Sequence, residues 1–164
     1  MQFRADDYYN AAIERMREAQ ELYRNGRSYS LTMYCSGLAV ECLLRAFRWR
    51  VEQTFEGRHD LVELFQASRL QRIDDDYLRR KSLSEESLRV EGRKLRTALN
   101  DVVLLWHNNL RYASEARLKK FLSQIHRLQG VKGDPLKKNA LDLFNAARMV
   151  VDRGIVLWTS RTRS

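Results

Sequence analysis

The chain has 164 residues, a length that favours one domain and can bury a core without disulfides or metal. A hydrophobic fraction of 44% and a single Pro exclude a disordered chain. With charged residues at 31%, no segment approaches the apolar length of a membrane span. The start "MQFRADDYYN" has no apolar signal core, so we expect a cytoplasmic protein with no membrane partner.

The charge balance is strongly basic. The formal net charge is +9, and most of the 30 basic residues are Arg. Arg side chains bind phosphate in a bidentate manner and stack on bases, so the composition suggests an anionic partner, with RNA or DNA the leading candidates. The alternative is a solvated, Arg-rich surface with no such partner.

The apolar periodicity is helical throughout, and no strand pattern occurs, so we expect an all-α, up-down bundle of about five to six helices. Residues 1–160 form a single domain in this interpretation, and residues 161–164 form a short basic tail. The expected helices are, in chain order, 5–25, 28–54, one beginning at Asp60, 84–108, 114–129 and 135–158.

The second of these helices is apolar on nearly every side, which predicts the centre of the bundle. Its small residues, Gly37 among them, permit close helix contacts. Cys35 and Cys42 are seven residues apart and cannot form a disulfide with each other on one helix, so we interpret them as small buried hydrophobic residues. Glu41 interrupts this apolar run and needs a partner if it is buried.

The third helix has a clear start signal. Asp60, with Glu63 three residues later, predicts an N-terminal cap, and His59 is expected to pack just before it. The polar stretch that follows, 72–88, is a connector, or a short helix and a loop.

The fourth helix carries Arg89, Arg93 and Arg96 at helical spacing, on a face away from its apolar residues. These three are candidate binding residues for an anionic ligand. The sequence Asp134-Pro135 predicts the start of the last helix, with a capping Asp and Pro in the first helical position.

Three segments in this order resemble the HEPN domain family: "NGRSYSLTMYCSGLAVECLLRAF", "RHDLVELF" and "LLWHNNLRYAS". In that family a buried second helix bears an acidic residue, a His-Asp-Leu opens the third helix, and a polar cluster ends a later one. The resemblance covers roughly Ala5 to Tyr112 and extends to the C-terminal helix.

The resemblance implies a helical bundle that forms a homodimer. Many members are metal-independent ribonucleases of toxin–antitoxin and phage-defence systems, often encoded beside a small nucleotidyltransferase, which is then the expected partner. Others bind nucleotides or act as adaptors without cleavage. We expect no cofactor and no metal site.

The ribonuclease members carry an Arg separated from a His by four to six residues, and none of the three histidines here has such an Arg before it. His107 and Arg111 stand instead in reversed order, four apart, on one face if the helix continues. An imidazole can exchange protons near neutral pH, and an Arg can stabilise a phosphate. The alternative is an interfacial His beside an Arg that pairs with Glu41.

We expect the Glu41–Arg111 pair in preference to an exposed Glu41–Arg45 pair, within one polar pocket formed by Glu41, His107, Arg111 and Tyr112. His107 and Arg111 are the candidate catalytic residues. Besides the three arginines above, the candidate binding residues are Glu41, Tyr112, Asn108 and His59.

Three functions remain open from the sequence. The first is a HEPN-like module, in a prokaryotic toxin–antitoxin or phage-defence system, that binds RNA, a nucleotide or a protein without cleavage. The second is a divergent metal-independent ribonuclease that uses His107 and Arg111. The third is a helical adaptor that binds no nucleic acid.

Overall fold

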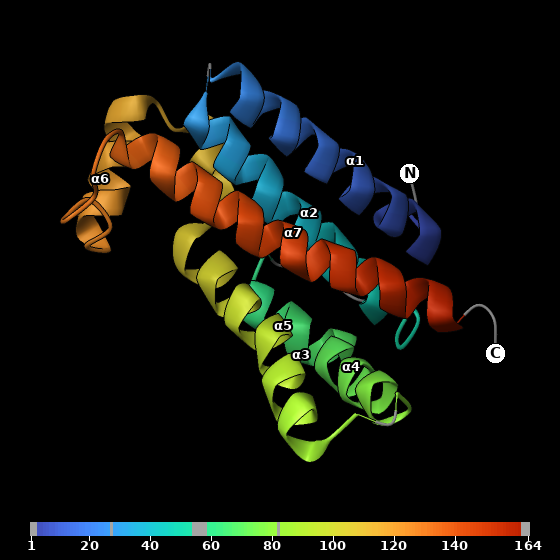
Figure 1. The fold of residues 1–164 in the computed structure, drawn as a ribbon. Helices are drawn as coiled ribbons and strands as arrows, with labels where there is room; N and C mark the ends of the chain where they lie inside the picture. Colours follow the sequence, from blue (N-terminus) through green and yellow to red (C-terminus); the bar gives the residue numbers. More distant parts are fainter. Residues whose placement is uncertain (1–2, 27, 54–58, 82, 162–164) are drawn as a thin grey trace.

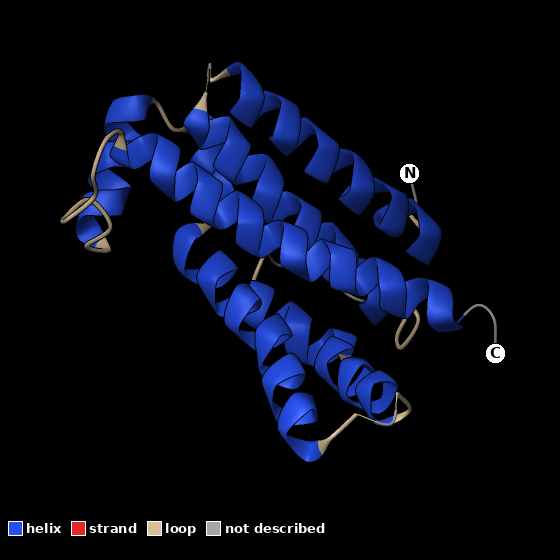
Figure 2. Cartoon of the chain, viewed as in Figure 1, coloured by secondary structure: helices blue, strands red, loops and turns tan. Residues whose placement is uncertain are grey.

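The computed structural model describes residues 3–26, 28–53, 59–81 and 83–161. In these ranges the chain is helical, with no strand, and the expected all-α bundle is confirmed (Figure 2). Its elements, listed in chain order, are α1 (Ala5–Asn25), α2 (Tyr29–Trp49), α3 (Leu61–Ser68), α4 (Leu70–Arg79), α5 (Glu85–Leu105), the 3₁₀ helix η1 (Asn108–Tyr112), α6 (Glu115–Gln124) and α7 (Pro135–Arg161).

The four long helices give the bundle its topology. Figure 1 shows α1 and α5 running in one general direction and α2 and α7 in the other, with α3 and α4 beside α5 and α6 near the start of α7. Helix α2 packs against α1, α7, α3 and η1, which explains why it is apolar on nearly every side. Its predicted place at the centre of the bundle is confirmed.

Local signals set most helix starts. Asp60 accepts hydrogen bonds from the backbone N–H groups of Val62 and Glu63, at 2.9 and 3.0 Å, so its predicted cap is confirmed. Asp134 caps α7 by the same means, through the backbone N–H group of Leu136 at 2.9 Å. Gly26 ends α1 with a left-handed backbone at φ 61°, a conformation that costs glycine little.

Several predicted boundaries differ from the structure. Helix α2 ends at Trp49 and not at Thr54, which lies outside the described residues. The stretch 72–88, expected as a connector or as a short helix and a loop, contains most of α4, so the short helix of the second alternative is present. Helix α6 ends at Gln124, because the chain turns to a positive φ of 57° at His126.

The C-terminal end also differs from the prediction. Helix α7 continues to Arg161, three residues beyond the expected end at Trp158, so the start of the predicted loose tail is helical. The rest of that tail, residues 162–164, lies outside the described part of the chain.

Two glycines fix how the helices meet. A Cβ atom added at Gly37 of α2 would lie 2.0 Å from Cδ1 of Trp106, so only glycine leaves room for this indole. At Gly154 of α7, a Cβ atom would lie 2.4 Å from Cδ2 of Leu43, which belongs to α2. The close contact predicted at Gly37 is therefore made by a side chain from the end of α5, not by a neighbouring helix backbone.

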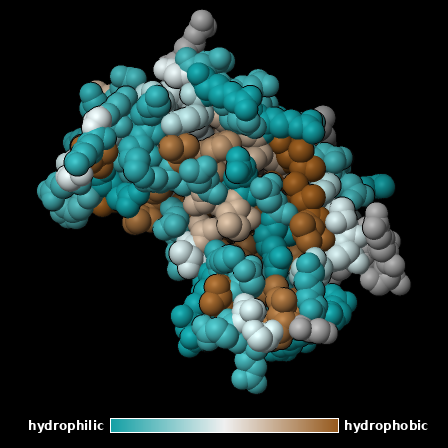
Figure 3. All heavy atoms as spheres, in the orientation of Figure 1, coloured by the Kyte–Doolittle hydropathy of each residue, from teal (hydrophilic) through white to brown (hydrophobic). Residues whose placement is uncertain are grey.

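The surface is polar with local apolar areas, some of them visible along the face shown in Figure 3. Met149 and Val156 of α7 and Leu104 of α5 are exposed hydrophobic side chains. No described helix is both long and apolar enough to cross a membrane. Cys35 and Cys42 are free thiols, and burial raises the pKa of Cys42 to about 11.

Candidate functional site

The buried acid of α2 is the starting point of the site. Glu41 is only 2% exposed, and its Oε1 atom accepts hydrogen bonds from Nε and Nη2 of Arg45, both at 2.7 Å. The two residues are four apart, so one turn of α2 brings them together. Arg45 is itself buried, and the carboxylate and guanidinium neutralise each other inside the bundle.

His59 is the third member of this group. Its Nδ1 atom lies 2.8 Å from Oε2 of Glu41, although the two residues are 18 positions apart in the chain. The side chain of His59 is 47% exposed, so one edge of the ring faces the buried carboxylate while the rest reaches the surface. His59 is therefore a partner of Glu41, beyond the packing role that the sequence suggested.

The end of α5 supplies the opposite wall. The helix stops at Leu105, and Trp106 leaves it with an extended backbone that directs the indole against α2. The indole Nε1–H donates to the backbone carbonyl of Tyr34 at 3.1 Å. His107 then caps η1, because its Nδ1 atom accepts the backbone N–H of Asn109 at 3.1 Å.

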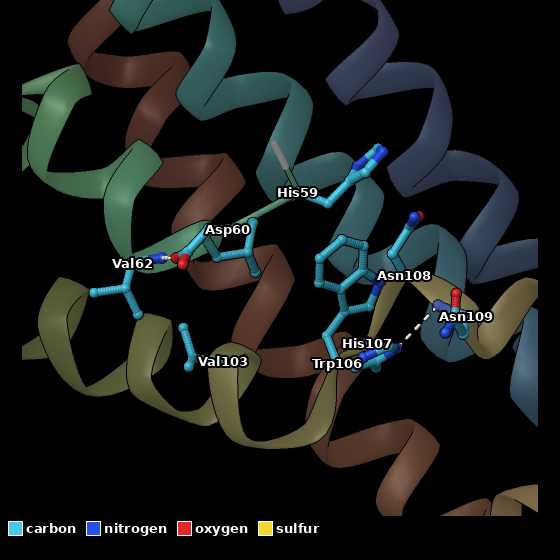
Figure 4. Close-up of a pocket in the computed structure, with 9 residues that line it drawn as sticks. His59, Asp60, Val62, Val103, Trp106, His107, Asn108 and Asn109 are labelled. Atoms are coloured by element: carbon cyan, nitrogen blue, oxygen red, sulfur yellow. Dashed lines mark hydrogen bonds between the residues drawn. The ribbon is translucent and has the colours of Figure 1, made fainter. Parts of the chain in front are cut away.

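These elements surround one cavity of about 550 Å³ (Figure 4). Nine residues line it: His59, Asp60, Leu61, Val62, Val103, Trp106, His107, Asn108 and Asn109. In this view the Trp106 indole stands between the side of the cavity that holds His59 and the side that holds His107. The cavity thus combines two imidazoles, two amides and an apolar floor.

The hydrogen bonds determine which nitrogen of each imidazole carries the proton. A carboxylate only accepts hydrogen bonds, so Nδ1 of His59 must be protonated, and its Nε2 is left as an acceptor in the neutral ring. Nδ1 of His107 accepts a backbone N–H, so the hydrogen of the neutral ring sits on Nε2. In these neutral tautomers Nε2 of His59 is a hydrogen-bond acceptor, and Nε2–H of His107 is a hydrogen-bond donor.

Asn108 adds a further polar group to the lining. Its Oδ1 atom is buried and finds no hydrogen-bond donor among the residues that the structure describes. Buried acceptors are usually satisfied, by protein, water or a bound molecule.

Over the described ranges, no group of three or more His, Cys, Asp or Glu side chains could hold a metal ion.

The predicted pocket around Arg111 is wrong. Glu41 pairs with Arg45 and His59, and no ion pair among the described residues joins Glu41 to Arg111. The sequence predicted Arg111 as the partner of Glu41, with an exposed Glu41–Arg45 pair as the alternative. The structure has the Glu41–Arg45 pair, and both residues are buried. Arg111 lies on η1, where three residues make a turn, so a residue four positions from His107 does not share its face.

Arg111 belongs to a separate surface group. Its guanidinium carbon lies 4.7 Å from the ring centre of Tyr112, and a hydrogen bond to the side chain of Tyr34 raises the pKa of Arg111. Tyr112 is 76% exposed. Neither Arg111 nor Tyr112 lines the cavity that contains His59 and His107.

The three arginines of α5 lie elsewhere on the surface. Arg89 pairs with Glu86 at 2.9 Å, and Arg96 is exposed. Arg93 lines a different cavity, between α5 and α7, together with Lys94, Asp101 and Asp142. None of the three lines the cavity of Figure 4, so the structure does not bring them together with the histidines.

Comparison with protein families identifies the domain. The family model of the HEPN domain matches residues 5–155, which include every element of the site. The chain belongs to the HEPN family. Comparison with curated proteins gave no significant match, and comparison with solved structures gave none either. Membership in the HEPN family agrees with the helical bundle, and the partners of Glu41 come from the structure of this chain.

The sequence missed Trp106 and Asn109 as parts of the site. Trp106 looked like one more apolar residue of a helix, because nothing local marks Leu105 as the end of α5. No regular spacing in the sequence predicts the pairing of His59 with Glu41. The two residues are 18 positions apart, and they meet because α3 packs against α2. Only the pairing with Arg45 had a signal, the separation by four residues on one helix.

Proposed function

We propose that this HEPN domain is a non-catalytic module that binds RNA or a nucleotide in the cavity between His59 and His107. The observation that supports it is the convergence of two imidazoles and two Asn amides on one cavity, in a chain with a net charge of +9. Protonated imidazoles and amide N–H groups donate to phosphate oxygens, and the apolar floor suits a ribose or a base.

The buried pair beneath His59 supports binding in a specific way. Arg45 already neutralises Glu41, so the carboxylate orients the His59 ring without placing an uncompensated negative charge beside an incoming phosphate. Nε2 of His59 is then the ring atom left to meet the ligand, as a donor once the ring is protonated.

The test is fluorescence anisotropy with a labelled 12-nucleotide RNA over a range of salt concentrations. We expect affinity to fall as salt rises, and to fall in His59→Ala and His107→Asn. The side chain of Asn at position 107 can still accept the backbone N–H that His107 accepts at the start of η1, but it has no imidazole. A loss of affinity in His107→Asn therefore reports on the imidazole and not on the fold of η1. Arg72→Ala, an exposed residue of α4, is the control. If neither the RNA nor AMP binds the wild-type protein at low salt, the adaptor function replaces this proposal.

The opposite roles of the two imidazoles favour one second candidate, a metal-independent endoribonuclease. Nε2 of His59 would take the proton of a ribose 2′-hydroxyl as its oxygen attacks phosphorus. His107 would act in its imidazolium form, which gives up the hydrogen bond from Asn109 at Nδ1, and would pass its Nε2 proton to the leaving 5′ oxygen as the P–O5′ bond breaks. The products are a 2′,3′-cyclic phosphate and a 5′-hydroxyl. In this candidate His59 takes the place that the sequence had given to Arg111.

Incubation of the protein with RNA in the presence of EDTA tests this candidate. Cleavage that ends in cyclic phosphates and is lost in both His59→Ala and His107→Asn would establish it. Intact RNA after long incubation with a protein that binds it leaves the non-catalytic module as the function.

We further propose that the module acts as a homodimer in the cytoplasm of a prokaryote, within a toxin–antitoxin or phage-defence system and beside a partner nucleotidyltransferase. Many HEPN domains form dimers and occur in such systems, which supports this proposal. The exposed side chains of Leu104, Met149 and Val156 offer apolar area for a protein contact. Two free thiols fit a reducing compartment. Light scattering tests the dimer, and a single-chain mass at high micromolar concentration would contradict it.

A further inference from the structure

A second, smaller cavity adjoins the first. It has a volume of about 150 Å³ and lies between η1 and α6. His107 and Asn109 line both cavities, so they form the wall between them. On the α6 side, the polar lining residues are Arg117 and Gln124. A ligand larger than one nucleotide can therefore continue from the first cavity across His107 toward α6.

Tyr112 stands on the same 3₁₀ helix with its ring unused by the fold. At 76% exposure it is the most exposed large side chain among the described hydrophobic residues. The guanidinium carbon of Arg111 lies over the ring, 4.7 Å from its centre. An exposed aromatic ring beside a cation is the arrangement that binds an unstacked base and the phosphate next to it.

Helix α6 adds further positive charge beside η1. Arg117, Lys119 and Lys120 are exposed, and none of them makes an ion pair with another described residue. Glu115 is the acidic residue on the exposed surface of this short helix. Unpaired cations lose no protein partner when they bind phosphate, so this surface favours a polyanion over a second copy of an equally basic chain.

We propose that η1 and α6 form a platform for single-stranded RNA, with a base stacked on Tyr112 and neighbouring phosphates bound by Arg111 and Arg117. This inference rests on the proposed function and names its ligand class. The strand continues over His107 into the first cavity, so the site spans several nucleotides. A duplex is excluded as a good ligand because its bases are already stacked and present no free face to the ring.

The experiment compares three labelled or titrated probes: a 12-nucleotide single strand, the same sequence as a 12-base-pair duplex, and AMP. We expect the single strand to bind more tightly than the duplex. Tyr112→Ala should weaken single-strand binding about tenfold or more, while Tyr112→Phe retains most of the affinity because the ring remains. Arg117→Ala should lower the salt dependence by about one phosphate contact, and Arg72→Ala should change nothing.

The outcomes separate this platform from the proposed function. Two results would overturn the platform and leave the proposed binding in the first cavity intact. One is an unchanged affinity of Tyr112→Ala for the single strand, and the other is an equal affinity of the wild-type protein for single strand and duplex. A change of molecular mass in Tyr112→Ala, with RNA affinity unchanged, assigns the ring to a protein contact and also overturns it. If Tyr112→Ala still binds AMP but no longer binds the single-stranded RNA, the result supports the platform.

Discussion

Gly37 is the position where a single methyl group is expected to have the largest effect for its size. In Gly37→Ala the new Cβ atom would lie 2.0, 2.1 and 2.4 Å from Cδ1, Cγ and Nε1 of Trp106. The indole is buried, and its N–H donates to the carbonyl of Tyr34, so it cannot move without loss of packing and of that hydrogen bond.

The magnitude follows from three contributions. Overpacking costs about 1–3 kcal/mol, and a lost hydrogen bond costs about 1 kcal/mol. Alanine gains about 1 kcal/mol of helix propensity over glycine, so the net loss of unfolding free energy is about 1–3 kcal/mol. For a chain of this length the melting temperature should fall by about 3–10 °C. A Gly37→Leu variant should lose more, because it adds a larger side chain at the same place.

The assay is thermal unfolding followed by circular dichroism, with Gly92→Ala as the matched control. Gly92 is also inside a helix, but its added Cβ atom would lie 3.6 Å from Oδ1 of Asp75, an ordinary contact, so this variant should gain about 0.5–1 kcal/mol. Replacement of Trp106 by Phe should reduce the cost of Gly37→Ala. If Gly37→Ala melts at or above the wild-type temperature, the packing argument is refuted.

Two further predictions concern charged groups in the fold. Arg45→Ala leaves the buried carboxylate of Glu41 with His59 alone and should cost roughly 3–5 kcal/mol in urea unfolding, whereas Arg111→Ala should leave stability unchanged; equal effects would contradict the pairing described here. Burial raises the pKa of Asp74, so the stability that its neutral form contributes is present at low pH and lost as pH rises through the raised value. Arg153 lies 2.5 Å from this carboxylate and lowers its pKa, so Arg153→Met should raise it further in an NMR titration, and a fall would count against the assignment.

Much of the fold was predictable because its signals are local. The caps at Asp60 and Asp134, the stop at Gly26 and the all-round apolar surface of α2 each follow from a few neighbouring residues, and all are confirmed. Helix α4 was harder to delimit, although Leu70, Ile73 and Leu78 form a buried apolar stripe on it. The left-handed residue Arg69 separates α3 from α4, and no glycine or proline marks that break.

Only part of the membership of the candidate site was predictable from the sequence. His59, His107, Asn108 and Glu41 were all named from the sequence, and the structure brings the first three to one cavity, with Glu41 bonded to His59 behind it. The predicted position of the Arg111 side chain was wrong because the prediction continued the α-helical period past Leu105. Helix α5 ends there, and a 3₁₀ helix follows. A change of helix type alters which side chains share a face, and hydrophobic periodicity carries no signal for it.

The two glycine contacts also determine where this chain tolerates a change of length. Helix α2 receives Trp106 at Gly37 and inserts Leu43 at Gly154, so the separation of six positions between Gly37 and Leu43 sets both contacts at once. One residue inserted between them would rotate one contact by about 100° relative to the other and shift it by about 1.5 Å. The loop around Gly130 and Gly133 has no atom within 4 Å of an added Cβ at either glycine. Insertions and deletions among relatives should therefore collect in that loop and avoid the middle of α2.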